Sequence, residues 1–242
     1  MNNTLIQTYA IDSYSTDFEK KYDLCSLLRH YQNAVFLHAD ELGVDGTTIW
    51  NKFKAIWIIT RMRVDLGEMP KWRDVIEVET YPLTPGIVRM EREGVIKKDG
   101  KAFANISSEW VVLDQASGRP KRPSDIDYPD VTHREGRVAG EYSNLAFAFD
   151  ESDYVYSYTA RVSDIDMNRH FNNIAYARLA VDAFSAEELE NKKQKSFEIA
   201  FKAQSFEGET LRIYRKNIGD RKYAVSAFKE NGTAVFETTF QF

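Results

Sequence analysis

The chain of 242 residues is long enough for one large domain or two small ones, each with its own core. Hydrophobic residues make up 43% of it and aromatic residues 13%, which excludes an intrinsically disordered protein. The net charge of −5 argues against non-specific nucleic-acid binding as a main role, so we expect no nucleic-acid partner.

A single cysteine, Cys25, excludes an internal disulfide and suits a reducing compartment. The opening residues Met1-Asn2-Asn3-Thr4 contain neither a basic nor an apolar segment, so we expect no signal peptide. No uncharged apolar run is long enough to span a bilayer. These features predict a soluble, cytoplasmic protein without a membrane span.

The first half predicts one helix followed by long strands. After a strand over 5–11, a helix ends at Gly43, and its apolar face consists of Leu24, Leu27, Leu28, Tyr31, Val35, His38 and Leu42. From Trp50 onward the residues alternate, which predicts strands up to 66 and over 75–81, 87–97 and 101–113. This order indicates an α+β fold with a sheet wrapped around a helix.

The second half repeats this plan after a Pro- and Gly-containing stretch over 118–142. The expected elements are a strand over 154–162, a helix over 173–184, and strands over 197–205, 210–216, 222–229 and 234–240. The hairpin turn at Asp99-Gly100 corresponds to the one at Asn231-Gly232. We therefore expect an N-terminal domain over 1–117, a connector over 118–150 and a C-terminal domain over 151–242.

A polar run from Ser163 to Asn173 separates the strand and the helix of the second copy. Asn172 or Asn173 can cap the helix, whose first amides favour developing negative charge. The opening Asp164-x-Asp166-x-Asn168 matches an EF-hand calcium loop. The match then fails, because Arg169 stands where Gly is needed and Ala175 where a bidentate Glu is needed. We expect no metal site, and a solvated loop before a capped helix is the simplest interpretation of the run alone.

The longer pattern Asp166-x-Asn168-x-His170-x-Asn172-Asn173-x-x-Tyr176 resembles the signature of the acyl-ACP thioesterases of the bacterial type, fatty-acyl hydrolases with two fused hotdog domains. The segments 57–64, 72–78 and 99–112 resemble the first domain of that family, in the same order. The resemblance covers nearly the whole chain. It implies an α+β tandem double hotdog in which each half is a long helix wrapped by an antiparallel sheet.

The resemblance implies that Asp166, Asn168 and His170 are catalytic and that no cofactor is needed. At alternate positions of an extended loop, a carboxylate, an amide and an imidazole share one side, where they can activate water and polarise a thioester carbonyl. Either Asp166 or His170 could take the first proton. The corresponding segment of the first copy, 14–21, lacks this run, and in the family the first domain forms much of the acyl-chain tunnel.

The family also brings an acidic residue from the strand after the helix. Aligning residues 196–205 with that strand places Gln204 at this position, followed by Ser205. Glutamine can hydrogen-bond but cannot act as a base, so either Gln204 orients the water or the activity is slower or altered. Glu207 and Glu209 fall in a predicted turn and are not assigned to the site.

The remaining reactive side chains are assigned elsewhere. We expect Cys25 to be a packing residue, His38 a core histidine, and His30 and His133 surface or linker residues. No Gly-x-Ser-x-Gly motif is present, so an α/β-hydrolase triad is not expected.

The partner that the resemblance implies is acyl carrier protein (ACP) bearing a fatty acyl chain. Carrier protein is acidic, so basic docking residues are expected at 192–195 or 119–122, although a solvated surface explains both runs as simply. A hotdog acyl-CoA thioesterase and a non-catalytic acyl-binding hotdog protein are the alternatives, and a homodimer is possible.

Overall fold

The computed structural model of the chain describes residues 3–131, 134, 136–167, 169–190 and 192–242. The chain forms two compact units, Met1–Glu141 and Tyr142–Phe242, called here the first and second units. The boundary after Glu141 lies inside the stretch 118–150.

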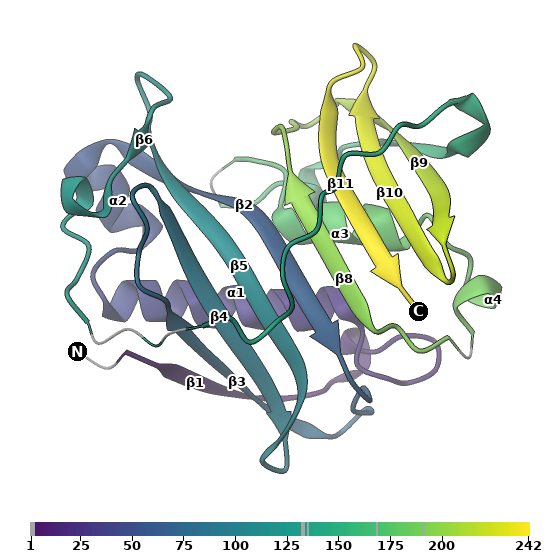
Figure 1. Ribbon diagram of the computed structural model, residues 1–242, viewed down its shortest axis with the longest axis horizontal. Coiled ribbons are helices and arrows are strands. Elements are labelled where there is room, and N and C mark those ends of the chain that lie inside the picture. Colours follow the sequence, from purple (N-terminus) through teal and green to yellow (C-terminus); the bar gives the residue numbers. More distant parts are fainter. Residues whose placement is uncertain (1–2, 132–133, 135, 168, 191) are drawn as a thin grey trace. The chain divides into compact units, whose positions relative to one another are not determined.

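The first unit is an antiparallel sheet packed on one long helix. Its strands follow the order β1-β3-β4-β5-β2, with β6 paired to β5. The strands are β1 (Leu5–Ala10), β2 (Ala55–Leu66), β3 (Val75–Pro82), β4 (Arg89–Lys98), β5 (Lys101–Asp114) and β6 (Pro120–Lys121). The helices are α1 (Leu24–Glu41) and α2 (Gly46–Phe53), with 3-10 turns η1 (Ser13–Ser15) and η2 (Pro123–Ile126). In Figure 1, α1 runs behind β4 and β5.

Close packing holds α1 against this sheet. Asp23 caps the helix by accepting the amide of Ser26 at 2.8 Å. A Cβ on Gly94 would lie 2.5 Å from the ring of Tyr31, so only glycine allows this approach of helix and strand. His38 is fully buried and its Nδ1 bonds to the Arg92 guanidinium, which confirms it as a core histidine.

Helix α2 was not predicted. The alternating pattern from Trp50 predicted a strand, but residues 46–53 are helical. Asp45 explains the difference, because its carboxylate accepts the amides of Thr47 (2.8 Å) and Thr48 (3.2 Å) and so starts a helix among β-branched residues. Lys54, with a φ of 48°, ends the helix in the left-handed region, and β2 begins at the next residue.

The second unit repeats the plan with a shorter helix. Its strands follow the order β8-β11-β10-β9-β7. They are β7 (Tyr154–Thr159), β8 (Ser196–Phe201), β9 (Thr210–Gly219), β10 (Lys222–Lys229) and β11 (Ala234–Gln241). The helical segments are α3 (Asn173–Val181) and α4 (Ala186–Leu189), with 3-10 turns η3 (Glu151–Asp153) and η4 (Val162–Asp164). The helix of this half is the shorter of the two, since α3 has 9 residues against 18 in α1.

The stretch predicted to have little regular structure contains β6 and η2, and its later part is held by carboxylate side chains. In the first unit, Val138 donates its amide to Glu93 at 2.7 Å and Gly140 donates to Asp65 at 2.6 Å. In the second unit, Ser143 bonds to the buried Glu198 through both its amide and its hydroxyl. Irregular backbone in this stretch is therefore fixed by side chains of each unit's own sheet.

Candidate active site

Asp166 and His170 form the two ends of a tight loop between η4 and α3. The Asp166 amide donates to the His170 carbonyl at 2.8 Å, and the His170 amide donates to Asp166 Oδ1 at 3.2 Å. Arg169 sits between them with a φ of 62°, and its amide donates to the Asp166 carbonyl at 3.0 Å. The carboxylate of Asp166 therefore closes the loop as well as bringing a charge to it. Asn168, the third predicted catalytic residue, lies outside the described residues.

The base of the loop is fixed by Asp164, which the prediction treated only as part of a failed calcium pattern. Its carbonyl accepts the Asn172 amide at 2.8 Å, which brings the two ends of the loop together. Its carboxylate is only 4% exposed and accepts from Tyr158 Oη (2.7 Å), Arg178 Nη2 (2.6 Å) and the Arg161 amide (2.8 Å). Because Asp164 is buried and paired with Arg178, its carboxylate has a structural role. Nothing in the sequence alone indicates that Asp164 would contact Tyr158 and Arg178, and only the folded structure shows it.

The loop leads directly into α3. Asn172 caps this helix by accepting the Ile174 amide at 2.8 Å, so of the two predicted cap residues it is the one used. The first amides of α3 therefore follow His170 within a few residues, and such amides favour negative charge near the helix start.

Gln204 lies in a segment that runs beside this loop. Strand β8 ends at Phe201, so the strand predicted over 197–205 is shorter and Gln204 is an exposed loop residue. The carbonyl of Ser205 accepts the Phe171 amide at 3.3 Å. The ring of Phe206 meets the His170 imidazole edge to face at 6.2 Å. These two contacts bring the 204–206 segment against the residues at and after His170.

A carboxylate clamp holds the far end of this segment. Glu209 accepts the Phe206 amide at 3.0 Å and pairs with Lys229 at 2.9 Å. Its backbone carbonyl accepts the Ala160 amide at 2.9 Å. These contacts give Glu209 a structural role, in line with its exclusion from the predicted site.

The first unit contains a loop of the same construction between η1 and α1. Asp17 Oδ1 accepts the Lys21 amide at 2.9 Å, and the Asp17 amide donates to the Lys21 carbonyl at 2.8 Å. Lys20 has a φ of 62°, the same value as Arg169. Counting along the two loops, the residues that match Asp166, Asn168 and His170 are Asp17, Glu19 and Lys21.

The neighbouring segment is repeated as well. Its carboxylate clamp recurs in the first unit, where Asp74 accepts the Lys71 amide at 2.8 Å and pairs with Lys98 at 2.7 Å. The Pro70 carbonyl accepts the Tyr22 amide at 2.8 Å, as the Ser205 carbonyl accepts that of Phe171. In place of an imidazole, however, this loop carries Lys21, whose ammonium pairs with Glu19 at 3.0 Å. The two units thus share the loop architecture, and only the second carries the histidine.

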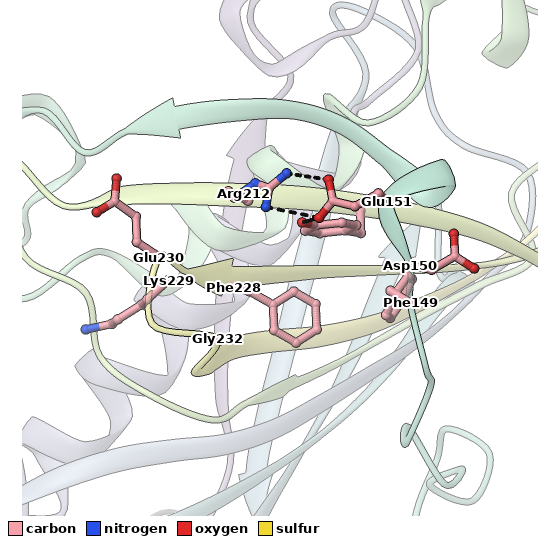
Figure 2. Close-up of a pocket in the computed structure, with 9 residues that line it drawn as sticks. Phe149, Asp150, Glu151, Arg212, Phe228, Lys229, Glu230 and Gly232 are labelled. Carbon is pink, nitrogen blue, oxygen red and sulfur yellow. Dashed lines mark hydrogen bonds and ion pairs between the residues drawn. The ribbon is translucent and has the colours of Figure 1, made fainter.

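A pocket of about 200 Å³ lies elsewhere on the second unit and includes none of the predicted site residues. Figure 2 shows Phe149 and Phe228 on its wall and the guanidinium of Arg212 facing Glu151. Two hydrogen bonds of 3.1 and 2.7 Å already engage Arg212 with that carboxylate. No ligand is assigned to this pocket.

Several other predicted residues differ in their surroundings from expectation. His30 is not a plain surface residue, because its ring stacks on Tyr9 at 4.2 Å and its Nδ1 lies 2.6 Å from the Tyr22 hydroxyl. Within the 192–195 run, Lys192 lies over the rings of Tyr223 and Phe242, which leaves Lys193 and Lys195 as the exposed lysines.

Lys121 pairs with Asp114 at 3.1 Å, whereas Arg119 and Arg122 are exposed. Cys25 is half-buried on α1, and His133 lies outside the described residues. Over the described part of the chain, no group of three or more His, Cys, Asp or Glu side chains could hold a metal ion, and no helix is long and apolar enough to cross a membrane.

Comparison with known proteins identifies the family. A palmitoyl-acyl carrier protein thioesterase of Arabidopsis thaliana is 27% identical over 82% of the chain and 51% of its own length. The chain therefore spans about half the length of the curated relatives it matches. A crystal structure of an acyl-ACP thioesterase from Bacteroides thetaiotaomicron superposes with a TM-score of 0.90 at 23% identity, over 99% of this chain and 98% of that one.

A second solved structure, the 12:0-ACP thioesterase from Umbellularia californica, gives a TM-score of 0.88 at 20% identity, over 100% of this chain and 97% of that one. The fold is thus an α+β double hotdog. Family models of the acyl-ACP thioesterase N-terminal and C-terminal domains match residues 2–127 and 148–239. The chain belongs to the acyl-ACP thioesterase family.

Proposed function

We propose that the protein hydrolyses the thioester of fatty acyl-ACP to a free fatty acid and ACP. The observation that carries this proposal is the imidazole of His170 in the loop that Asp166 closes before α3, where the matching loop of the first unit carries Lys21, in a chain of this family. Both residues are half-buried, so they combine a partly dry environment with access for a substrate.

The residues of the loop supply the groups that thioester hydrolysis requires. A water oxygen attacks the carbonyl carbon, Asp166 or His170 takes the proton of that water, and the carbon–sulfur bond breaks to release a thiolate. The thiolate is then protonated and leaves with the carrier, while the hydroxyl stays on the acyl group as the new acid. Amides at the start of α3 and the Asn168 side chain are suited to stabilise the oxygen that gains negative charge. Gln204 orients the water.

The two units divide the work in this proposal. Residues 1–117 form the hotdog that takes the acyl chain, 118–150 connect, and 151–242 form the catalytic hotdog. The first loop supports the division, since Lys21 stands where the second has His170 and is already paired with Glu19. The proposal also includes a cytoplasmic location and a homodimer, as the sequence analysis expects.

We propose that the acyl chain of the substrate is attached to the carrier protein rather than to coenzyme A. An acidic carrier is attracted by exposed cations, and Lys193 and Lys195 are exposed just before β8. The same reaction on acyl-CoA, or acyl binding without hydrolysis, are the alternatives that an experiment must separate.

The test measures release of fatty acid and of free thiol from palmitoyl-ACP, dodecanoyl-ACP and the matching acyl-CoA esters. Faster turnover of the carrier-linked esters is expected, and the variant Lys193→Glu/Lys195→Glu is expected to lower kcat/KM for them alone. The exposed pair Lys71→Glu/Lys101→Glu is the charge-matched control. Equal loss in both variants would reject the docking surface, faster turnover of acyl-CoA would favour the other handle, and binding without release would favour a non-catalytic protein.

A further inference from the structure

Tyr176 connects helix α3 to the segment that carries Gln204. Its hydroxyl accepts the backbone amide of Ser205 at 2.8 Å, and both residues are buried, with exposed fractions of 3% and 0%. A buried amide that lost this acceptor would have no water to replace it, so the bond is costly to remove. The Ser205 backbone is therefore held from two sides, by Tyr176 at its amide and by Phe171 at its carbonyl.

The ring of Tyr176 is itself held in place. It packs on Phe171 with centroids 4.4 Å apart, and on Phe201 and Phe236 at 6.1 and 5.8 Å. Phe171 directly follows His170 in the chain, and Phe201 ends the strand that leads to Gln204. The phenol oxygen thus has a position defined by the elements on both sides of the site.

Comparison of the two loops shows that this bond is peculiar to the second unit. Five residues after Phe171 comes Tyr176, whereas five residues after the matching Tyr22 comes Leu27. The residue that matches Ser205 is Pro70, which has no amide hydrogen. The first unit keeps the carbonyl contact but has neither partner of the hydroxyl–amide bond. The bond therefore accompanies the histidine loop and is not needed to build the shared architecture.

Burial raises the pKa of Tyr176, and the carboxylates of Glu209 and Asp166 act in the same direction, against the lowering effect of its contact with Ser205. The phenol therefore stays neutral at physiological pH and serves as a fixed hydrogen-bond acceptor rather than as a base.

We propose that Tyr176 is a positioning residue that sets Gln204 beside His170 by holding the amide of Ser205. This inference rests on the proposed thioesterase function and adds to it a residue that does not itself touch the reacting atoms. Without the hydroxyl, the 203–206 segment keeps its clamp at Glu209 but loses its anchor next to Gln204, so the water that Gln204 orients is misplaced.

The test compares Tyr176→Phe, which removes one oxygen, with Tyr156→Phe. Tyr156 is the matched control, because its hydroxyl donates to the Leu179 carbonyl of the same helix at 2.7 Å and lies outside the 203–209 segment. On acyl-ACP, Tyr176→Phe is expected to lower kcat about tenfold with KM changed less than about twofold, the scale of a misplaced orienting group. Tyr156→Phe is expected to lower Tm by a similar amount and leave kcat unchanged.

Two further measurements separate positioning from general destabilisation. Gln204→Ala should have little further effect on kcat in the Tyr176→Phe background, because the two residues act on one water. Hydrogen exchange of the peptide covering 203–209 should be faster in Tyr176→Phe than in Tyr156→Phe. Ser205→Pro, which copies Pro70 and removes the amide, should reproduce the loss of kcat and serves if Tyr176→Phe does not fold.

The proposal is overturned if kcat of Tyr176→Phe falls no more than that of the control, or if the effects of Tyr176→Phe and Gln204→Ala multiply. The exchange measurement needs no substrate, so it tests the anchoring of the segment even if the parent protein hydrolyses no acyl-ACP. In that case the thioesterase proposal fails separately, and unchanged exchange would reject the positioning role as well.

Discussion

At the scale of single residues, the two loops show that an aspartate in this turn has a structural task. Asp17 and Asp166 each accept the amide of the residue four positions on, and Asp17 does so in a loop without histidine. Replacing Asp166 with alanine therefore changes the loop and the proposed chemistry together. The first unit offers the means to separate them, because its loop shares the turn and lacks the proposed chemistry.

The first prediction uses that pair. Asp17→Ala should lower the free energy of unfolding by about 1 to 3 kcal/mol, since Asp17 Oδ1 accepts the amides of both Glu19 and Lys21, and leave kcat unchanged. Asp166→Ala should cost a similar free energy but lower kcat at least about a hundredfold. Asp166→Asn keeps an oxygen acceptor for the His170 amide, so it should retain stability and still lose kcat.

Urea denaturation and acyl-ACP turnover measured on the same preparations check both parts. A stable Asp166→Asn variant with nearly full kcat would show that the negative charge is not used in the reaction. The carboxylate would then serve only to close the loop.

The second prediction concerns Gln204, the exposed residue at the position where the family resemblance expects an acid. Gln204→Ala should cost less kcat than Asp166→Ala or His170→Ala, because a water-orienting amide contributes less than a charged group. Gln204→Glu should hold or raise activity, since a carboxylate can stabilise the imidazolium that forms when His170 takes a proton.

The measurement is kcat against pH for the parent and for Gln204→Glu on one acyl-ACP. Repulsion between the new carboxylate and Asp166 would instead move the pH optimum upward. A folded Gln204→Glu variant that is inactive at every pH would exclude the family acid from this position.

At the scale of elements, the sequence predicted those whose signals are local. The helix over 24–42 and the hairpins at Asp99-Gly100 and Asn231-Gly232 are confirmed, because periodicity and turn residues act over a few positions. Helix α2 was missed, since a single cap at Asp45 outweighs the β-branched residues that follow. The early end of β8 at Phe201 was also missed, because it depends on contacts between residues distant in sequence: the amides of Lys202 and Ala203 both donate to the Val235 carbonyl of β11.

The third prediction belongs to strand β4 and the connector segment that crosses it. Burial raises the pKa of Glu93, and the carboxylate of Glu91 adds to this, although the Val138 amide and the Ser107 hydroxyl oppose it. The folded state thus binds the proton of Glu93 more tightly than the unfolded state does. The stability that this proton adds to the folded state is present at low pH. It is lost as the pH rises through the pKa of Glu93 in the folded protein.

Glu93→Gln removes this titration. The free energy of unfolding of the parent relative to Glu93→Gln should therefore increase as pH falls from 8 to 5, measured by urea denaturation of both proteins at each pH. A difference that stays constant or shrinks toward pH 5 would contradict a raised pKa at this position.

At the scale of the whole molecule, the tandem architecture was predictable because the order of elements repeats in the sequence. The equivalence of the two loops was not, because Asp17-x-Glu19-x-Lys21 and Asp166-x-Asn168-x-His170 share one aspartate and little else. Only backbone hydrogen bonds and the left-handed residues Lys20 and Arg169 make the match plain. The duplication therefore lies in the backbone, while the chemistry proposed here lies in the side chains of one copy.

In the proposed mechanism the second loop hydrolyses the thioester and the first does not. Its most direct test is the kcat for palmitoyl-ACP of the parent, His170→Ala and Lys21→Ala, with folding checked for each. We expect a loss of at least about a hundredfold for His170→Ala and no change for Lys21→Ala, which removes the side chain at the matching position. A folded His170→Ala variant with nearly full kcat, or an equal loss in Lys21→Ala, would contradict it.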